Sequence, residues 1–279
     1  MDQQHLETAL ALAKQIASQY EQVFQVEAVV LGGSYATGLA EPASDIDLYV
    51  YSHTAIPLTD REVIAKESSS ALEFNNQFWE TGDEWTDRST GIHVDVMFRH
   101  TKWIKEQLDQ VLVRHEASLG YSTCLWHNVQ TAILLFDRQG WFTALQEKAQ
   151  QSYPDALQQA ILSKNYPLLR KASSAYRSQL KKAISRADVV SINHRLTAFL
   201  ASYFDIIFAI NRLPHPGEKR LIDIVEKTCR LVPHGMRKML HQILKAPMHK
   251  DLLPFIDALI DELDTLLRNE GLLLGDTSI

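Results

Sequence analysis

The chain has 279 residues and a mass of 31.7 kDa, enough for two domains and for a hydrophobic core that needs no disulfide or metal. Its 28 Lys and Arg stand against 34 Asp and Glu, and this net charge of −6 disfavours a protein that binds DNA or RNA along its length. A hydrophobic content of 46% with 22% charged residues excludes wholesale disorder.

The cysteines and the apolar segments indicate a soluble protein of the cytoplasm. Cys124 and Cys229 lie far apart and belong to no metal-binding cluster, so we expect two reduced thiols. The first 24 residues contain three acidic residues and a helical pattern instead of the apolar block of a signal peptide. The apolar stretch Phe199–Ile210 is too short to cross a bilayer. We therefore expect a cytoplasmic protein without a membrane contact.

The first half of the chain alternates between helical and strand patterns. Apolar residues at helical spacing between Leu6 and Tyr20 predict an opening amphipathic helix. Leu58–Ser70 also has a helical pattern. Short apolar and β-branched runs predict four strands, at Val26–Leu31, Ile46–Tyr51, Ile92–Phe98 and Thr131–Phe136.

After about Gly140 the strand patterns stop and helical patterns continue to the end of the chain. The longer predicted helices are Trp141–Ser152, Asp155–Asn165, Leu168–Ala187 and Val189–Arg212. Prolines break the pattern after that, and three shorter helices follow, the last at Asp251–Asn269 with Gly271 ending it. We expect an α+β fold class, with a mixed β-sheet flanked by helices in residues 1–145 and an all-α helical bundle in residues 146–279.

The most informative stretch is Leu31–Val50, in which a predicted strand runs into Gly32, Gly33 and Ser34. Glycines let backbone N–H groups approach an anion closely, and the serine offers a hydroxyl to a phosphate oxygen. Taken alone, such a sequence is more often a tight turn than a phosphate-binding loop.

Three aspartates make the phosphate interpretation stronger. Asp45 and Asp47 alternate with Ile46 on a predicted strand, so both carboxylates lie on one face. Neighbouring carboxylates repel each other unless a cation lies between them, and Mg²⁺ prefers oxygen ligands. Asp95 interrupts another strongly apolar strand. If the two strands are neighbours, three carboxylates converge, as a two-metal phosphoryl-transfer site requires. A solvated strand edge is the alternative for the first pair.

This combination of a Gly-Gly-Ser turn, Asp45-x-Asp47 and a later Asp95 resembles the nucleotidyltransferase superfamily of polymerase-β-like enzymes. The order of domains resembles small bacterial members such as the aminoglycoside and lincosamide nucleotidyltransferases. Tyr153-Pro154 and the run Phe208–Arg212 resemble, more loosely, a helical domain of unknown function that accompanies such enzymes.

The resemblance implies a role for each matching residue. Asp45, Asp47 and Asp95 would be the catalytic residues and would bind two Mg²⁺ ions, and Asp95 would help to deprotonate the acceptor hydroxyl. The donor would be a nucleoside triphosphate, with ATP as the first expectation. Its phosphates would be held by a set of small residues, Gly32, Gly33, Ser34 and Ser44. A P-loop ATPase is excluded, because no Gly-x4-Gly-Lys-Ser/Thr sequence is present.

Two weaker patterns suggest further contacts. Four carboxylates precede the Asp95 strand, and tryptophans flank them; the acidic residues are Glu80, Asp83, Glu84 and Asp87. This segment is either an acceptor-binding lip that attracts a cationic molecule or a solvated acidic loop. In the second half, Lys219 and Asn211 are candidates for binding the nucleotide, although helix-terminal cations are commonly surface residues.

We therefore expect a metal-dependent nucleotidyltransferase that transfers a nucleoside monophosphate to a hydroxyl and releases pyrophosphate. The expected acceptor is a small, antibiotic-like molecule, and DNA is not expected as a partner. Two alternatives remain open: a toxin–antitoxin type enzyme that modifies a partner protein or tRNA, and an inactive nucleotide-binding regulator.

Overall fold

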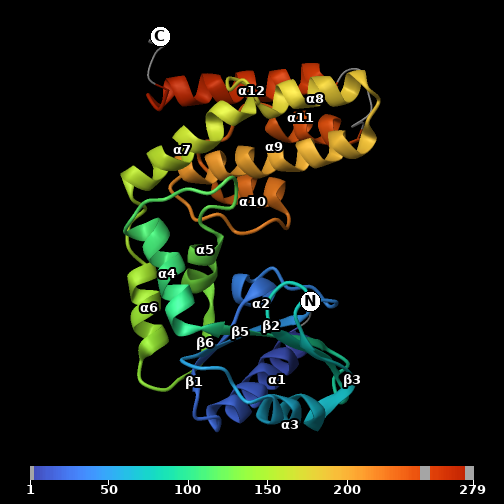
Figure 1. Cartoon of the computed structure of the whole chain (residues 1–279), viewed down its shortest axis with the longest axis vertical. Coiled ribbons are helices and arrows are strands. Elements are labelled where there is room, and N and C mark those ends of the chain that lie inside the picture. Colours follow the sequence, from blue (N-terminus) through green and yellow to red (C-terminus); the bar gives the residue numbers. More distant parts are fainter. Residues whose placement is uncertain (1–2, 246–251, 274–279) are drawn as a thin grey trace. The chain divides into compact units, whose positions relative to one another are not determined.

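The computed structural model describes residues 3–245 and 252–273, and its N-terminal region contains one six-stranded sheet. The strand order is β3-β4-β5-β2-β1-β6. Figure 1 shows this sheet together with α1 and α3. The bounds are β1 (Val26–Leu31), β2 (Ile46–Ser52), β3 (Ser69–Asn76), β4 (Gly82–Asp87), β5 (His93–His100) and β6 (Ile133–Asp137). Only β2 and β5 pair in parallel, and the other pairs are antiparallel, so the sheet is mixed.

Helices flank the sheet and account for the rest of this region. They are α1 (Gln3–Glu21), α2 (Gly33–Thr37), α3 (Leu58–Ser68), α4 (Thr101–Leu112), α5 (Cys124–Thr131) and α6 (Trp141–Ala149). Buried α1 residues such as Leu12 and Ile16 join Leu48, Val50 and Val96 of the sheet in one hydrophobic core. Alternation along each strand therefore fixes which side chains enter this core and which lie on the opposite face.

The opposite face is covered at one end by aromatic packing. The ring of Tyr51 lies 5.4 Å from that of Trp141 and 5.5 Å from that of Phe142, between ring centroids. Tyr49 and Asp47 precede Tyr51 on the same face of β2. Tyr49 is buried, whereas Asp47 is partly exposed. The beginning of β2 thus presents its polar residues to solvent.

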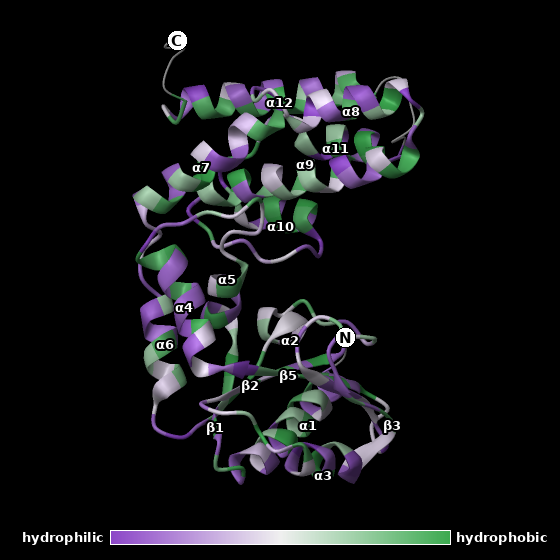
Figure 2. Cartoon of the chain, viewed as in Figure 1, coloured by the Kyte–Doolittle hydropathy of each residue, from purple (hydrophilic) through white to green (hydrophobic). Residues whose placement is uncertain are grey.

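The C-terminal region is helical, with α7 (Asp155–Leu169), α8 (Tyr176–Ser185), α9 (Val189–Ile210), α10 (Leu221–Thr228), α11 (Met236–Lys245) and α12 (Leu252–Asn269). Its core is a separate hydrophobic cluster built around α9, which is buried from Ala201 to Ile210. Figure 2 shows alternating hydrophobic and hydrophilic stretches along α12, the pattern of a helix with one buried face. The chain divides into two compact units, and residues 110–124 belong to the second.

A buried carboxylate ties a loop to the helices of the second unit. Asp205 in α9 is 1% exposed and accepts hydrogen bonds from Ser122 N at 3.0 Å, Ser122 Oγ at 2.6 Å and Asn165 Nδ2 at 3.2 Å. Burial raises the pKa of Asp205 to about 6. The hydrogen bonds lower the cost of keeping this carboxyl in an apolar helix.

The predicted fold class is confirmed, because a mixed sheet flanked by helices precedes an all-helical region. The four predicted strands are present, and Gly271 follows α12 with a φ of +66°. The predicted helix at Leu168–Ala187 is wrong at its start, because α7 continues through Pro167 to Leu169 and α8 begins only at Tyr176. The predicted start of the last helix, Asp251, lies outside the described residues.

The structure also contains elements that the sequence patterns did not predict, namely β3, β4, α4 and α5. The polar segment from Ser69 to Asp87 has few β-branched residues, so its strand signal is weak. The prediction of an acidic loop upstream of Asp95 is therefore wrong, since Asp83, Glu84 and Asp87 lie on β4. No helix among residues 3–245 and 252–273 is long and apolar enough to cross a membrane.

Two buried residues attach the β3–β4 hairpin to α3. Arg61 donates from Nε to Asp83 Oδ2 at 3.0 Å and from Nη2 to Asp83 Oδ1 at 2.7 Å. Asp83 is fully buried and Arg61 is 4% exposed. The Arg61 guanidinium also lies 4.0 Å from the centroid of the Phe98 ring. Both charges therefore depend on each other for compensation inside the protein.

We predict that Asp83→Ala lowers the free energy of unfolding by about 3 kcal/mol, because it leaves the Arg61 charge buried without its partner. Urea denaturation followed by circular dichroism measures the change. The exposed pair Lys66–Glu62 provides the control, and Lys66→Ala should change the same quantity by less than about 0.5 kcal/mol. Equal effects of the two substitutions would contradict the structural role of the buried pair.

Candidate active site

Four carboxylates form a row across four neighbouring strands. Asp47 of β2 is in register with Asp95 of β5, Asp95 with Glu84 of β4, and Glu84 with Glu73 of β3. Residues in register on adjacent strands point to the same face, about 4.8 Å apart. The structure therefore brings Asp47 and Asp95 together as neighbours, and it extends the row with two glutamates.

The row creates a site where negative charge is costly. Burial, together with the carboxylates of Glu84 and Asp45, raises the pKa of Asp95 to about 6, whereas His93 acts in the opposite direction. Asp45 lies one residue before β2, close enough to affect Asp95. A cation placed among these carboxylates would relieve the repulsion, which is the condition that favours a metal or a basic group.

The glycine turn lies directly against this row. Gly33 has a φ of +57°, and a Cβ atom there would lie 1.7 Å from Asp47 Oδ2. A Cβ on Gly32 would lie 2.3 Å from Cε2 of Tyr49, and Gly32 N donates to the Asp47 carbonyl at 2.8 Å. A side chain at either position would force Asp47 or Tyr49 to move. The turn and the first carboxylate of the row consequently form one continuous surface.

The two serines of the predicted phosphate site differ in their surroundings. The Oγ of Ser34 is buried and has no hydrogen-bond partner in the part of the chain that the structure describes. Ser44 Oγ accepts a hydrogen bond from Glu41 N at 2.8 Å, and Ser44 N donates to the Glu41 carbonyl at 2.9 Å. Ser34 thus has a hydroxyl in need of a partner, whereas Ser44 stabilises the turn that leads into β2.

The acidic segment is divided among several roles. Glu80 binds Arg99 with two hydrogen bonds of 2.7 Å, and Asp83 is occupied by Arg61. Glu84 accepts from Asn76 Nδ2 at 2.9 Å and lies 3.7 Å from His93 Nε2, on the face of Asp95. Of the acidic residues predicted upstream of Asp95, only Glu84 is in register with Asp95.

Asp87 stabilises the turn that follows β4. Its carboxylate accepts from the backbone N–H and the hydroxyl of both Ser89 and Thr90, at 2.7 to 3.1 Å. Burial is the largest single influence and raises the pKa of Asp87, but the hydrogen bonds together outweigh it, so that the pKa is lowered. Asp87 is therefore a turn-forming residue between β4 and β5.

Asn211 and Lys219 belong to the second unit. The Asn211 side chain donates from Nδ2 to the carbonyls of Ile207 and Leu231, both at 2.8 Å. Its Oδ1 accepts from the backbone N–H groups of Arg230 and Leu231, also at 2.8 Å. The amide thus holds the loop after α10 against the end of α9. Lys219 is exposed.

The donor set suits a divalent cation that is completed by a substrate. Among the described residues, no group of three or more His, Cys, Asp or Glu side chains is arranged to hold a metal by itself. Mg²⁺ is commonly bound by one or two carboxylates together with substrate phosphates and water. Asp47 and Asp95 in register, Asp45 nearby and the unpartnered Ser34 hydroxyl fit such a shared site.

Sequence reasoning missed Glu84 as a neighbour of Asp95 and missed Glu73 altogether. Both depend on β3 and β4, whose strand patterns are weak. The signal that could have located Glu84 is the alternation in β4, where Asp83, Trp85 and Asp87 are buried while Glu84 is partly exposed.

Comparison with known families identifies both halves of the chain. Residues 12–117 match the nucleotidyltransferase domain family, and residues 122–220 match DUF4037, a domain of unknown function. The N-terminal region is therefore a nucleotidyltransferase domain, and the predicted superfamily and enzyme class are confirmed. No curated protein matches the chain.

Three solved structures are similar to this chain at a low level. A nucleotidyltransferase-like protein from Exiguobacterium sibiricum is 12% identical, with a TM-score of 0.42 over 94% of this chain and 76% of that one. The STING-associated CdnE c-di-GMP synthase from Capnocytophaga granulosa is 13% identical, with a TM-score of 0.33 over 98% and 84%. The Thermotoga maritima CCA-adding enzyme complexed with tRNA is 12% identical, with a TM-score of 0.31 over 100% and 84%.

We predict that Gly33→Ala disrupts the site more than Gly38→Ala does. Gly38 has a φ of +70°, and a Cβ atom there would have no neighbouring atom within 4 Å, so its substitution carries only the backbone cost of the left-handed conformation, about 1–2 kcal/mol. Alanine at position 33 adds a clash with the Asp47 carboxylate. Thermal unfolding and nucleotide binding of both variants measure the difference, and equal behaviour would contradict the contact.

We predict that Asp95→Asn stabilises the metal-free protein at pH 8 but not at pH 4. The pKa of Asp95 is about 6 in the folded protein, whereas the unfolded chain loses this proton near pH 4. Between these two pH values the folded protein therefore binds more protons than the unfolded chain. The contribution of Asp95 to the wild-type free energy of unfolding therefore falls as the pH rises from about 4 to about 6. The loss is about 1–2 kcal/mol after allowance for solvent screening.

Thermal unfolding across this pH range in EDTA tests the prediction. The exposed Glu147 supplies the control, because Glu147→Gln should shift the midpoint equally at both pH values. An Asp95→Asn variant that is less stable than wild type at pH 8 would disprove the electrostatic cost.

Proposed function

We propose that this nucleotidyltransferase domain transfers a nucleoside monophosphate from a nucleoside triphosphate to a hydroxyl of a small molecule, with pyrophosphate as the second product. The observation that carries the proposal is the register of Asp47 with Asp95 beside a turn whose glycines lie against the side chains of Asp47 and Tyr49. A phosphate-binding turn and a pair of neighbouring carboxylates are the two parts that phosphoryl transfer needs. ATP is the donor to be tested first.

Residues of the turn hold the triphosphate in this proposal. Gly32 and Gly33 allow the backbone to approach the phosphates, and the Ser34 hydroxyl donates to a phosphate oxygen. Asp45, Asp47 and Asp95 would hold two Mg²⁺ ions, which would neutralise the negative charge that develops during phosphoryl transfer.

Asp95 also accepts the proton of the acceptor hydroxyl in this proposal. A carboxylate beside bound cations stays ionised near physiological pH, and an ionised carboxylate can take up the proton of the hydroxyl. The oxygen then attacks the α-phosphorus in line with the departing pyrophosphate, and binding both substrates side by side supplies much of the rate enhancement.

The acceptor we favour is a small cationic molecule that carries a hydroxyl. Glu84 and Glu73 extend the carboxylate row beyond Asp95, and Glu73 is exposed to solvent. A line of carboxylates attracts amines by long-range electrostatics and orients them next to the reacting hydroxyl. Glu84→Gln should therefore raise the KM for a cationic acceptor more than the KM for the nucleotide.

Thermal unfolding with each of the four nucleoside triphosphates, with and without Mg²⁺, tests donor binding. A ligand that binds only the folded state adds about 2.7 kcal/mol of stability at one hundred times its Kd. We expect a Mg²⁺-dependent rise of the midpoint that Asp47→Asn abolishes. A rise that persists in Asp47→Asn would contradict the assigned site.

Release of pyrophosphate in the presence of candidate acceptors tests the second substrate. Turnover with hydroxyl-bearing amines, lost in Asp45→Asn, supports the proposal. Turnover only with tRNA or with a co-purifying protein would favour the toxin–antitoxin type of enzyme. Nucleotide binding without any turnover would favour an inactive regulatory protein.

A further inference from the structure

The charges of the chain are unevenly distributed. Residues Lys219–Lys245 carry seven Lys and Arg but only two acidic residues, so this segment has a net charge of +5. The remaining residues carry 21 Lys and Arg against 32 Asp and Glu, a net charge of −11. A local excess of cations in an acidic protein is the electrostatic pattern of an anion-binding surface.

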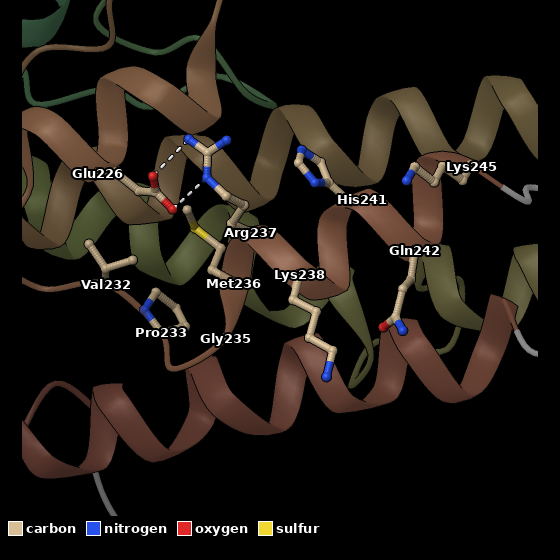
Figure 3. Close-up of a pocket in the computed structure, with 10 residues that line it drawn as sticks. All are labelled: Glu226, Val232, Pro233, Gly235, Met236, Arg237, Lys238, His241, Gln242 and Lys245. Carbon is tan, nitrogen blue, oxygen red and sulfur yellow. Dashed lines mark hydrogen bonds and ion pairs between the residues drawn. The ribbon is translucent and has the colours of Figure 1, made fainter.

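A pocket of about 720 Å³ lies in this basic segment. It is formed by α10, α11 and the loop between them, all within the second unit (Figure 3). Its volume falls in the range of small-molecule binding sites in proteins. The pocket involves none of the residues of the carboxylate row.

Helix α11 supplies most of the polar lining. Arg237, His241 and Lys245 lie on successive turns of the helix, and Lys238 and Gln242 form the neighbouring row (Figure 3). This is the arrangement that i, i+4 spacing dictates on a helix. The two rows place several hydrogen-bond donors along one pocket.

The cations differ in how they are held. Arg237 donates from Nε to Glu226 Oε1 at 2.8 Å, and its Nη2 pairs with Asp223 and Glu226, so its position is fixed by α10. Lys238 and Lys245 are exposed, and neither makes an ion pair within the described residues. Their ammonium groups are therefore available to an external anion.

The pocket also has an apolar part. Val232, Pro233 and Met236 line it beside the cations, and Pro233 and Met236 are buried. A free inorganic ion would leave this apolar surface unused. A ligand that joins a phosphate to an apolar or aromatic body would contact both parts.

We propose that this pocket binds a small phosphorylated molecule such as a nucleoside phosphate, with its phosphate held by basic side chains of α11 and its apolar body against Pro233 and Met236. The binding requires no metal, because the protein itself supplies the positive charge. The site is independent of the proposed function, since the carboxylate row and the glycine turn take no part in it.

Isothermal titration calorimetry on the full chain tests the proposal. The background is the double variant Asp45→Asn/Asp47→Asn in EDTA, in which metal-dependent nucleotide binding at the carboxylate row is disabled. The probes are inorganic phosphate, AMP, ATP and a single-stranded RNA. We expect AMP and ATP to bind more tightly than inorganic phosphate, with affinities that fall as salt is added.

Charge reversal locates the site. In the same background, Lys238→Glu/Lys245→Glu should weaken AMP and ATP binding at least tenfold. The control is Lys181→Glu/Lys182→Glu, two exposed lysines of α8 in the same unit, which should bind as before. All of these lysines are exposed, so the variants are expected to fold, and their thermal midpoints verify this.

Three results would overturn the proposal. They are the absence of binding at millimolar AMP and ATP, binding that the pocket lysines do not affect, and binding of a single-stranded RNA without binding of AMP or ATP. The last result would assign the surface to nucleic acid. The calorimetry uses a background without Asp45 and Asp47, so its result does not depend on the transferase site. A negative result would therefore not argue against the proposed transferase, and an inactive transferase would not argue against this pocket.

Discussion

The parallel pairing of β2 with β5 is the constraint on which the N-terminal domain depends. It sets Asp47 opposite Asp95. The antiparallel strands β4 and β3 then align Glu84 and Glu73 with this pair. A slip of one residue would turn one aspartate into the core and expose an apolar residue in its place. Burial of Leu48 and Val96 on the other face therefore fixes the position of the carboxylates.

Much of this arrangement could be predicted, because it depends on the alternation of apolar and polar residues within single strands. The strands around Asp47 and Asp95 are strongly apolar, so alternation alone places both carboxylates on the face opposite the core. Gly32 and Gly33, at the start of α2, are recognisable for the same reason. A buried strand that ends in two glycines indicates a place where another group lies close to the backbone. Their contact with Asp47 and Tyr49 is visible only in the structure.

The remaining features depend on long-range pairing that single residues do not reveal. Asp83 and Glu84 are adjacent acids in the sequence, yet one is buried against Arg61 and the other lies partly exposed beside Asp95. Asn211, a candidate nucleotide ligand by sequence, is a structural amide bonded to four backbone groups. For Asp83 and for Asn211 alike, a partner that defines the role of the side chain lies 19 or more residues away in the sequence.

The way in which the β3–β4 hairpin is attached has a consequence for how this enzyme can diversify. Arg61 binds Asp83 on one strand, and Arg99, which lies 3.9 Å above the Tyr49 ring, binds Glu80 just before it. The connection between β3 and β4 exposes Phe78 and Trp79, the latter by 95%. Substitutions at this tip touch neither the core nor the glycine turn. Selection can therefore alter this exposed tip of the hairpin while the fold that positions the carboxylates stays unchanged.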